Sequence, residues 1–215
     1  MTDSEETARH VRRTYDRIAG HFAETRAYPW PEVEAFLADA PEGRLGVDVG
    51  CGNGRHAEPM ADRVDRVVGV DVSAELLGRA SERARERGYP FDPICADAAA
   101  LPLADDCADL VVYVAALHHL PDRESRVRSL DELARVLAPG GRALVSAWST
   151  EHDRFDRESG FDTTVDWTLP GGETVPRFYH VYDPDEFRAD VADSALELVD
   201  FEISSGNCYG EVRVG

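Results

Sequence analysis

The chain has 215 residues, 43% of them hydrophobic, and its 42 acidic residues outnumber 23 basic ones to give a formal net charge of −19. This length is short for two complete domains and predicts a single α/β domain over residues 1–215. All 23 basic residues are Arg, and the acidic residues are spread along the whole chain. Because salt screens a dense carboxylate surface, this composition predicts a halophilic cytoplasm rather than an acidic interaction tail.

Neither an exported nor a membrane-bound protein is expected. Residues 1–6 are polar and acidic, which is untypical of a signal or transit peptide. The longest apolar run, residues 110–117, is well under the roughly 18 residues that suggest a membrane span. The four cysteines form no C-x-x-C pair and show no zinc-ligand spacing. The sequence therefore predicts reduced thiols, no metal site and a soluble cytoplasmic protein.

The N-terminal segment of residues 1–44 is predicted to be a helical cover. Apolar residues at helical spacing predict a helix over residues 7–22, with Tyr15, Ile18 and Phe22 in the core, and a shorter helix follows at residues 32–37. From residue 45 to 148 strand-like and helical segments alternate. The predicted strands there are residues 45–49, 66–71, 91–96, 109–114 and 142–147, and the predicted helices are residues 54–62, 73–87 and 123–137.

Such alternation predicts a Rossmann-like, mostly parallel sheet with helices on both faces. Residues 149–180 are predicted to be an insertion, because periodicity is lost from Thr150 to Val175 and the composition is polar. This insertion acts either as a lid over a site or as an exposed loop. Residues 181–215 are predicted to form a C-terminal helix, which Asp183 caps, and an antiparallel hairpin that brings the sheet to seven strands.

A glycine loop, Asp-Val-Gly-Cys-Gly-Asn-Gly at residues 48–54, follows a buried strand and precedes a helix. Glycines in this setting let the backbone approach a ligand at a helix N-terminus. The dinucleotide fingerprint is G-x-G-x-x-G, whereas here an acid precedes glycines spaced G-x-G-x-G. An anionic Asp48 repels phosphates but suits the cationic amino and sulfonium groups of S-adenosylmethionine. The loop therefore favours that cofactor over a dinucleotide.

Two further acids end the next two predicted strands. Asp71 stands 21 residues after Gly50, near the spacing at which an acid accepts hydrogen bonds from both ribose hydroxyls. Asp97 is placed to accept the adenine amino proton, while the backbone N–H of Ala98 meets a ring nitrogen. Ligands of open α/β sheets bind at such strand ends. The predicted cofactor-binding residues are Asp48, Gly50, Cys51, Gly52, Asn53, Gly54, Asp71, Val72, Asp97 and Ala98.

The stretch from residue 45 to 148 resembles the class I S-adenosylmethionine-dependent methyltransferases. Their usual landmarks match D-V-G-C-G-N-G, V-D-V-S, A-D-A and L-A-P-G-G in this chain. The resemblance implies S-adenosylmethionine as the methyl donor and S-adenosylhomocysteine as the product. It does not specify the acceptor, because this fold methylates small molecules, proteins and nucleic acids alike.

Three segments outside these landmarks are more particular: Y-D-R-I-A-G-H-F-A-E-T-R-A-Y-P-W-P from residue 15, A-A-L-H-H-L from residue 115 and R-F-Y-H from residue 177. Together they resemble the tRNA wobble-uridine carboxymethyl methyltransferases, in an archaeal, halophile-like form. The resemblance implies methyl esterification of 5-carboxymethyluridine in the anticodon loop. It also implies a small zinc-ribbon activator protein that adds a strand to the sheet edge, here near Phe91 to Ala96.

Acceptor residues follow from this resemblance and from the chemistry. A carboxylate with an ordinary pKa near ~4 is ionised at neutral pH and needs no general base to attack a methyl group. An Arg would anchor it, and aromatic rings would stack on the base. His118 is expected to face the methyl group, the alternative being that it only holds its loop. The predicted catalytic residues are Arg26, His118 and Arg177, and the predicted acceptor-binding residues are Tyr28, Trp30, Trp148, Tyr179 and His180.

Two other functions stay open on sequence alone. A methyltransferase of a quinone or another small acidic metabolite would share every cofactor landmark and would use the insertion to close its pocket. A non-catalytic S-adenosylmethionine-binding scaffold is disfavoured because the loop and the strand-end acids are intact. The acidic surface conflicts with tRNA binding, since phosphate contacts supply much of ordinary nucleic-acid affinity, but this objection weakens in concentrated salt.

Overall fold

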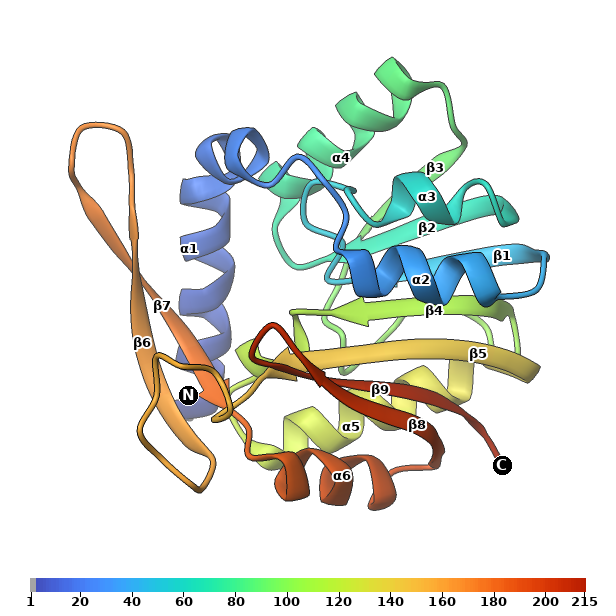
Figure 1. Cartoon of the computed structure of the whole chain (residues 1–215). Helices are drawn as coiled ribbons and strands as arrows, with labels where there is room; N and C mark the ends of the chain where they lie inside the picture. Colours follow the sequence, from blue (N-terminus) through green and yellow to red (C-terminus); the bar gives the residue numbers. More distant parts are fainter. Residues whose placement is uncertain (1–2) are drawn as a thin grey trace.

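A seven-stranded sheet runs through the centre of the computed structural model, which describes residues 3–215 (Figure 1). The strand order is β3-β2-β1-β4-β5-β9-β8. The first five strands in this order are parallel to one another, whereas β9 pairs antiparallel with both β5 and β8. The predicted mostly parallel sheet with a closing antiparallel hairpin is thereby confirmed. Its strands are β1 (Gly43–Val49), β2 (Val64–Asp71), β3 (Phe91–Cys95), β4 (Ala108–Val114), β5 (Leu137–Trp148), β8 (Leu196–Ser204) and β9 (Asn207–Val214).

Helices cover both faces of this sheet, so its central strands are buried on both sides. In β4, Val111 and Tyr113 pack on the face covered by α5 and α6, while Leu110 and Val112 pack on the face covered by α2 and α3. This explains why β4 is a continuous apolar run rather than an alternating one. The helices are α1 (Asp3–Thr25), α2 (Pro31–Asp39), α3 (Ala57–Met60), α4 (Ala74–Arg87), α5 (Arg123–Val136) and α6 (Pro184–Ala192), with a 3-10 turn η1 (Leu117–His119). None of these helices is long and apolar enough to cross a bilayer.

Three of the helices begin where their capping residues predict. The Ser73 side chain accepts a hydrogen bond from the backbone of α4, and Gly88 ends that helix in a left-handed conformation with φ of 78°. Asp122 caps α5, and Asp183 caps α6 by accepting from two backbone N–H groups. These caps start α4 and α5 immediately after the strand-end loops that carry the site.

Two predictions differ from the structure for reasons that their residues explain. The helix predicted over residues 54–62 is only the single turn α3, because the glycine loop precedes it and Pro59 has no N–H with which to extend the helical ladder. The predicted Pro139-Gly140-Gly141 turn lies inside β5 rather than before it. The pairing of β5 with β4 is irregular there, since the register shifts between Ala108 and Leu110.

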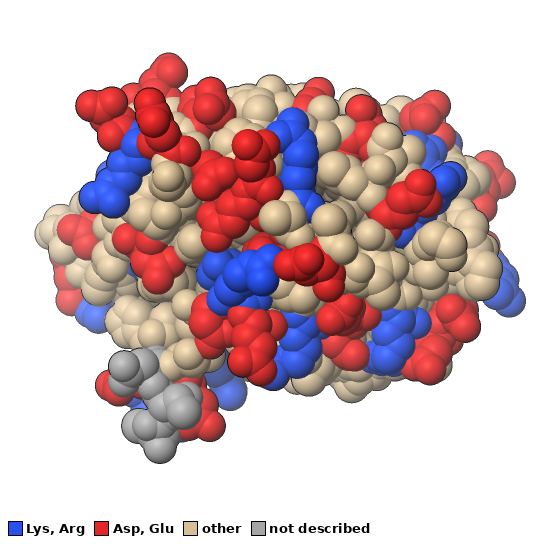
Figure 2. All heavy atoms as spheres, turned by 90° about the horizontal axis from the view of Figure 1, so that it is seen from below, with Lys and Arg blue, Asp and Glu red and all other residues tan. Residues whose placement is uncertain are grey.

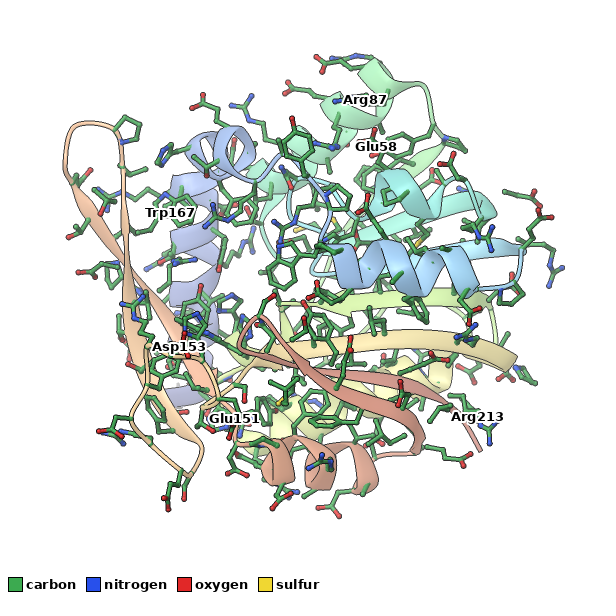
Figure 3. The ribbon with its side chains drawn as sticks, viewed as in Figure 1. Glu58, Arg87, Glu151, Asp153, Trp167 and Arg213 are labelled. Atoms are coloured by element: carbon green, nitrogen blue, oxygen red, sulfur yellow. The ribbon has the colours of Figure 1, made fainter. Side chains whose placement is uncertain are left out.

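The predicted irregular insertion is wrong for most of its length. Strands β6 (Phe161–Thr168) and β7 (Thr174–Val181) form a separate two-stranded antiparallel hairpin. The hairpin stands beside α1, apart from the central sheet (Figure 1). Its inward residues Trp167 and Val175 pack with Ile18 of α1, and Trp167 points toward that helix (Figure 3). The hairpin and α1 therefore form one cover over the carboxyl ends of the central strands.

Candidate methyl-transfer site

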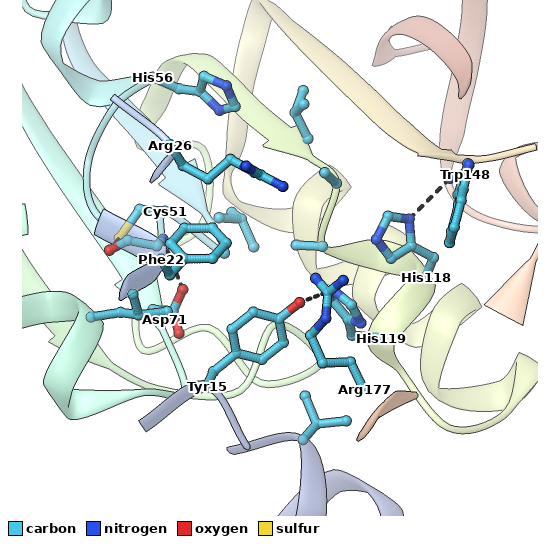
Figure 4. A pocket seen from close by; sticks show the side chains of 18 of the residues that line it. Tyr15, Phe22, Arg26, Cys51, His56, Asp71, His118, His119, Trp148 and Arg177 are labelled. Atoms are coloured by element: carbon cyan, nitrogen blue, oxygen red, sulfur yellow. Dashed lines mark hydrogen bonds between the residues drawn. The ribbon is translucent and has the colours of Figure 1, made fainter. Parts of the chain in front are cut away.

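A pocket of about 410 Å³ lies where β1, β2, β4 and β5 end, beneath α1 and the β6–β7 hairpin. Figure 4 shows Asp71 and Cys51 at one end of the pocket and His118 and Trp148 at the other, with Arg26 extending between them. The pocket brings together the sequence-predicted residues Arg26, Trp30, Gly50, Cys51, Gly52, Asn53, Asp71, Val72, Ala98, His118, Trp148, Arg177 and Tyr179.

The glycine loop bends tightly at the base of this pocket. Gly50 adopts a φ of +68° and lies so close to Ala116 that a Cβ at position 50 would stand 2.2 Å from the Ala116 Cβ. Gly52 also has a positive φ, +54°. A side chain at Gly50 would be strained and would collide with the loop after β4, so this position requires glycine. The backbone of residues 50–53 thus lines the pocket with little between it and a ligand.

Asp71, at the end of β2, organises the same loop. Its two carboxylate oxygens accept hydrogen bonds from the backbone N–H of Gly52 at 2.9 Å and of Ser73 at 2.8 Å. Burial raises the pKa of Asp71 to about 6, against the opposing effect of these two N–H groups. A carboxylate has about four lone-pair sites, so oxygens that already hold the loop can still accept from ligand hydroxyls. Its position at the pocket wall is consistent with the predicted ribose contact.

Asp48, in β1 at the start of the loop, does not line the pocket. Only 1% of its surface is exposed, and its Oδ2 atom has no hydrogen-bond partner among the described residues. Burial raises the pKa of Asp48 to about 7, while the nearby Arg55 lowers it. The Oδ1 atom of Asn53, within the loop, is likewise buried without a partner. A buried carboxylate with one unpaired oxygen at the start of the loop fits a cofactor with cationic groups and opposes a second anion such as a pyrophosphate.

Among the predicted adenine contacts, Ala98 lines the pocket and Asp97 does not. The Asp97 side chain is exposed and accepts a hydrogen bond from the backbone N–H of Ala99 at 2.9 Å, which caps the turn after β3. Gly54 also lies outside the pocket wall, packed against Ala80 of α4. The contact of Asp97 with adenine therefore stays a prediction from the sequence.

Four arginines converge on the pocket: the predicted Arg26 and Arg177, and also Arg55 and Arg154, which the sequence analysis missed. None of the four forms an ion pair with a carboxylate within residues 3–215, although many arginines elsewhere on the chain do. Their guanidinium groups lie over aromatic rings instead, Arg55 over Trp30 at 4.9 Å and the others over tryptophans of the same region. The pocket thus concentrates positive charge in a strongly acidic chain.

His118 is buried and holds one fixed tautomer. Its Nδ1 atom accepts a hydrogen bond of 2.9 Å from the backbone N–H of Trp148, which places the proton of the neutral ring on Nε2. Burial lowers the pKa of His118 well below its ordinary value, and the neighbouring charge of Arg177 acts in the same direction. The Nε2 side of the ring faces the pocket (Figure 4). His118 is therefore suited to donate a hydrogen bond there rather than to accept a proton.

The predicted aromatic residues divide into two groups. Trp30, Trp148 and Tyr179 line the pocket, and the Trp148 ring packs edge-on against Tyr179 at 5.1 Å. Tyr28 is 82% exposed and lies outside the pocket.

His180 also lies outside the pocket, so its predicted contact with the acceptor is not supported by its position. Side chains alternate along strand β7, and while Tyr179 faces the pocket, His180 is held between Asp162 at 2.7 Å and Glu186 at 2.9 Å. His180 thereby joins the hairpin to α6.

Several pocket residues had no local signal in the sequence. Tyr15 and Phe22, predicted to be core residues of α1, also line the pocket. The turn between β8 and β9 contributes Ser205, β9 contributes its first residue, Asn207, and the loop after β5 contributes His152. Only the folding of distant segments brings these side chains together. No group of three or more His, Cys, Asp or Glu side chains in the described part of the chain is arranged to hold a metal ion.

Known proteins resemble this chain both in sequence and in structure. Residues 47–145 match the family described as "Methyltransferase domain". The tRNA (carboxymethyluridine(34)-5-O)-methyltransferase of Schizosaccharomyces pombe is 32% identical over 164 residues, which cover 74% of this chain and 68% of that protein. The protein of the same name from Saccharomyces cerevisiae is 34% identical over 178 residues, covering 81% of this chain and 62% of that protein.

The solved structure titled "DhpI-SAH complex structure" superimposes over 100% of this chain with a TM-score of 0.75 at 19% identity. A mouse relative, tRNA (carboxymethyluridine(34)-5-O)-methyltransferase ALKBH8, is 36% identical over 153 residues. This chain spans only 22% of the length of that relative.

The parallel sheet, the glycine loop at the end of β1 and the acid at the end of β2 define a class I methyltransferase fold. The likeness to the two yeast proteins is more specific than the fold, since it extends over most of the chain. The chain belongs to the family of the tRNA (carboxymethyluridine(34)-5-O)-methyltransferases.

Proposed function

We propose that this protein transfers the methyl group of S-adenosylmethionine to the carboxylate of 5-carboxymethyluridine at the wobble position of tRNA. The observation that carries the proposal is the set of three pocket arginines, Arg26, Arg154 and Arg177, that form no ion pair with a carboxylate within the described residues. In a chain of net charge −19, arginines left without a carboxylate at a pocket indicate an anionic ligand. The names of the family's yeast members give the chemical identity of that ligand in those proteins.

The loop residues Gly50, Gly52 and Asn53 would hold the cofactor with Asp71, and Asp48 would balance its positive charge. When bound, S-adenosylmethionine supplies an electrophilic methyl carbon, to which an acceptor oxygen bonds as the S–C bond breaks, its electron pair returning to sulfur to leave S-adenosylhomocysteine. The remaining work falls to the residues of the chain. They must orient the acceptor, exclude water and hold its charge.

Arg26 and Arg177 are the proposed anchors of the acceptor carboxylate. Both guanidinium groups lie against the ring of Trp167, at 5.1 and 4.8 Å, on the side of the pocket that α1 and the hairpin cover. The acceptor carboxylate is already ionised at neutral pH, so no base is needed and positioning dominates. Good orientation supplies up to roughly 7 to 11 kcal/mol of a barrier. The Nε2–H of His118 adds a neutral donor that can fix one acceptor oxygen.

Aromatic rings are the proposed platform for the wobble base. Trp148 and Tyr179 pack edge-to-face in the pocket wall next to His118, and Trp30 also lines the pocket, where its ring contacts His56. Protein recognition of single-stranded RNA commonly stacks an unpaired base on such rings or on guanidinium planes. Arg154, over the Trp148 ring at 5.8 Å, is placed to contribute at this end.

A small zinc-ribbon activator protein is proposed to add a strand to the free edge at β3. The backbone N–H of Ala96 donates to the carbonyl oxygen of Asp71 in β2. Backbone N–H groups alternate in direction along a strand, so those of Asp92 and Ile94 also point toward β2. The backbone positions that point away from the sheet are Phe91, Pro93 and Cys95. Because Pro93 has no N–H, this edge offers outward donors only at Phe91 and Cys95. A Cys95→Pro change would remove one of the two and is expected to abolish co-purification of the activator.

The acidic surface is proposed to reflect a salt-rich cytoplasm. Figure 2 shows carboxylates distributed over one face, with arginines interspersed among them. Concentrated salt removes much of the gain from releasing counterions of tRNA, so stacking and carboxylate contacts would carry more of the affinity. Salt also screens the repulsion between this acidic surface and the tRNA phosphates, so methylation is expected to require high salt.

The test uses an anticodon stem-loop that carries 5-carboxymethyluridine, with methyl-labelled S-adenosylmethionine, high salt and the activator present or absent. We expect label in the wobble nucleoside and its release as methanol by mild alkali, since an ester is alkali-labile. The stem-loop with unmodified uridine is the matched control. Label that appears only in a small metabolite from a cell extract would contradict the proposal.

A further inference from the structure

A closed chain of hydrogen bonds joins three separate segments at the acceptor end of the pocket. The Nδ1 atom of His119, in η1, is 2.8 Å from the carbonyl oxygen of Phe178 in β7, and its Nε2 atom is 2.7 Å from the Tyr15 hydroxyl in α1. A carbonyl oxygen can only accept, so Nδ1 carries the proton of the neutral ring. Nε2 then accepts, and the Tyr15 hydroxyl is the donor (Figure 4).

The donors and acceptors in this series of hydrogen bonds keep their roles over the usual working range of pH. Burial lowers the pKa of His119 to about 3, and the charge of Arg177 acts in the same direction against the Phe178 carbonyl. Burial also raises the pKa of the Tyr15 phenol well above its ordinary value. Both groups are therefore neutral near pH 7, and the Tyr15 hydroxyl donates its proton in a hydrogen bond to His119.

The oxygen of Tyr15 is consequently left as an acceptor. The Arg177 guanidinium, which can only donate, interacts with this oxygen and lowers the pKa of Tyr15. Arg177 is the residue before Phe178, so the chain of hydrogen bonds returns to the strand from which the guanidinium extends. The guanidinium carbon also lies 4.8 Å from the Trp167 ring centroid and 5.1 Å from that of Tyr179.

All of these partners are neutral. A carboxylate beside Arg177 would neutralise its charge, whereas a phenol oxygen and two aromatic rings fix the guanidinium and leave its charge for a ligand. Within residues 3–215, Arg177 forms no ion pair with a carboxylate, and its Nε atom is buried without a hydrogen-bond partner. The contacts come from α1, η1 and β7, so they depend on the packing of α1 and the β6–β7 hairpin over the pocket.

We propose that Tyr15 and His119 are positioning residues that hold the Arg177 guanidinium toward the acceptor and give the site its preference for a carboxylate over a neutral carboxamide. This inference rests on the proposed function, in which Arg177 anchors the acceptor carboxylate. The carboxamide is the informative competitor, because it has nearly the same shape and no charge. Its NH₂ group also needs an acceptor, and Arg177 offers only donors.

The test measures binding of two anticodon stem-loops that differ only in carrying 5-carboxymethyluridine or 5-carbamoylmethyluridine, with S-adenosylhomocysteine present and salt fixed. The wild-type protein should prefer the carboxylate. Tyr15→Phe should reduce that preference about tenfold, the effect of one hydrogen bond to a charged group, with unchanged affinity for S-adenosylhomocysteine. Tyr113→Phe is the matched control, because this buried hydroxyl donates to Ser129 Oγ at 3.1 Å outside the pocket.

The outcomes separate the inference from the function on which it rests. A Tyr15→Phe protein with the wild-type preference overturns the inference, as does an equal loss in Tyr113→Phe. A wild-type protein that does not prefer the carboxylate overturns the proposed function as well. If Tyr15→Phe does not fold, His119→Asn is measured in its place. Its side-chain nitrogen can still reach the Phe178 carbonyl, but the acceptor for the Tyr15 proton is lost, so the same reduction is expected.

Discussion

The affinity for S-adenosylmethionine should depend on pH through two buried acids, Asp48 at the start of the glycine loop and Asp71 at the end of β2. Burial raises the pKa of Asp48 to about 7 and that of Asp71 to about 6. A cationic cofactor favours the ionised carboxylates, so protonation must weaken binding. Lowering the pH from 8 to 6 takes an acid of pKa 7 from about nine-tenths ionised to about one-tenth, which raises Kd about tenfold, or about 1.4 kcal/mol. Half-protonation of Asp71 at pH 6 adds about a factor of two.

The same two acids should affect the stability of the ligand-free protein in the opposite direction. Each has a higher pKa folded than unfolded, where it is near the ordinary value of 3.8. The folded state therefore binds more protons between about pH 4 and pH 7. Their contribution to the free energy of unfolding is fully present below about pH 4 and is lost as the pH rises through 6 and 7.

Isothermal titration calorimetry at fixed salt measures the first effect. Titrations at pH 6, 7 and 8, in buffers of different ionisation enthalpy, give both Kd and the number of protons released on binding. We expect release of up to about one proton near pH 6.5. Asp48→Asn should weaken binding at pH 8 and flatten most of the pH dependence. A wild-type Kd that stays constant from pH 6 to 8, with no proton release, would refute the assigned role of the buried acids.

Two variants test the ends of the pocket. Asp71→Ala should weaken S-adenosylmethionine binding at least about a hundredfold, because two hydrogen bonds to a charged group are worth about 3 kcal/mol or more. Calorimetry reads the affinity, and thermal unfolding reads the separate loss of the Gly52 and Ser73 contacts; unchanged affinity would remove Asp71 from the cofactor site. His118→Ala should lower kcat about 10- to 100-fold in methylation assays, with no change in the pH profile between 6 and 9, because the ring is neutral throughout. Loss of a titration near pH 7 in that variant would instead indicate a general base.

The cofactor end of the pocket was predictable because its residues carry local signals. Asp48 and Asp71 each end a buried strand, Ser73 caps the next helix, and the glycines stand at fixed spacing. Parallel strands bring their carboxyl ends to one edge of the sheet, so the sequence pattern alone places these groups together. No long-range contact had to be guessed.

The acceptor end was predictable only in part, because long-range packing decides it. Resemblance to a family indicated Arg26, Arg177 and His118, and these line the pocket. It gave no signal for Arg55, which follows the glycine loop. The resemblance could not distinguish Tyr179 from His180 either. Neither the strand β7 nor which of its side chains point into the pocket was predicted.

The hairpin itself had a weak signal that the polar composition obscured. Val165 and Trp167 alternate with Thr164, Asp166 and Thr168, and the first two are the buried residues of β6. A run with only two buried apolar positions is easily taken for a loop when its partner strand is unknown. The packing of Trp167 against α1 supplies the burial that makes this pair of strands stable.

The close approach of Gly50 to Ala116 means that the glycine loop and the loop after β4 cannot change shape independently. Ala116 stands two residues before His118, and the missing side chain at position 50 is the space it fills. A larger residue at either position would displace both the backbone of the glycine loop and the loop that carries His118. Substitutions here are therefore expected to alter donor affinity and acceptor turnover as one trait, and a second change across this contact is where a compensating mutation should be sought.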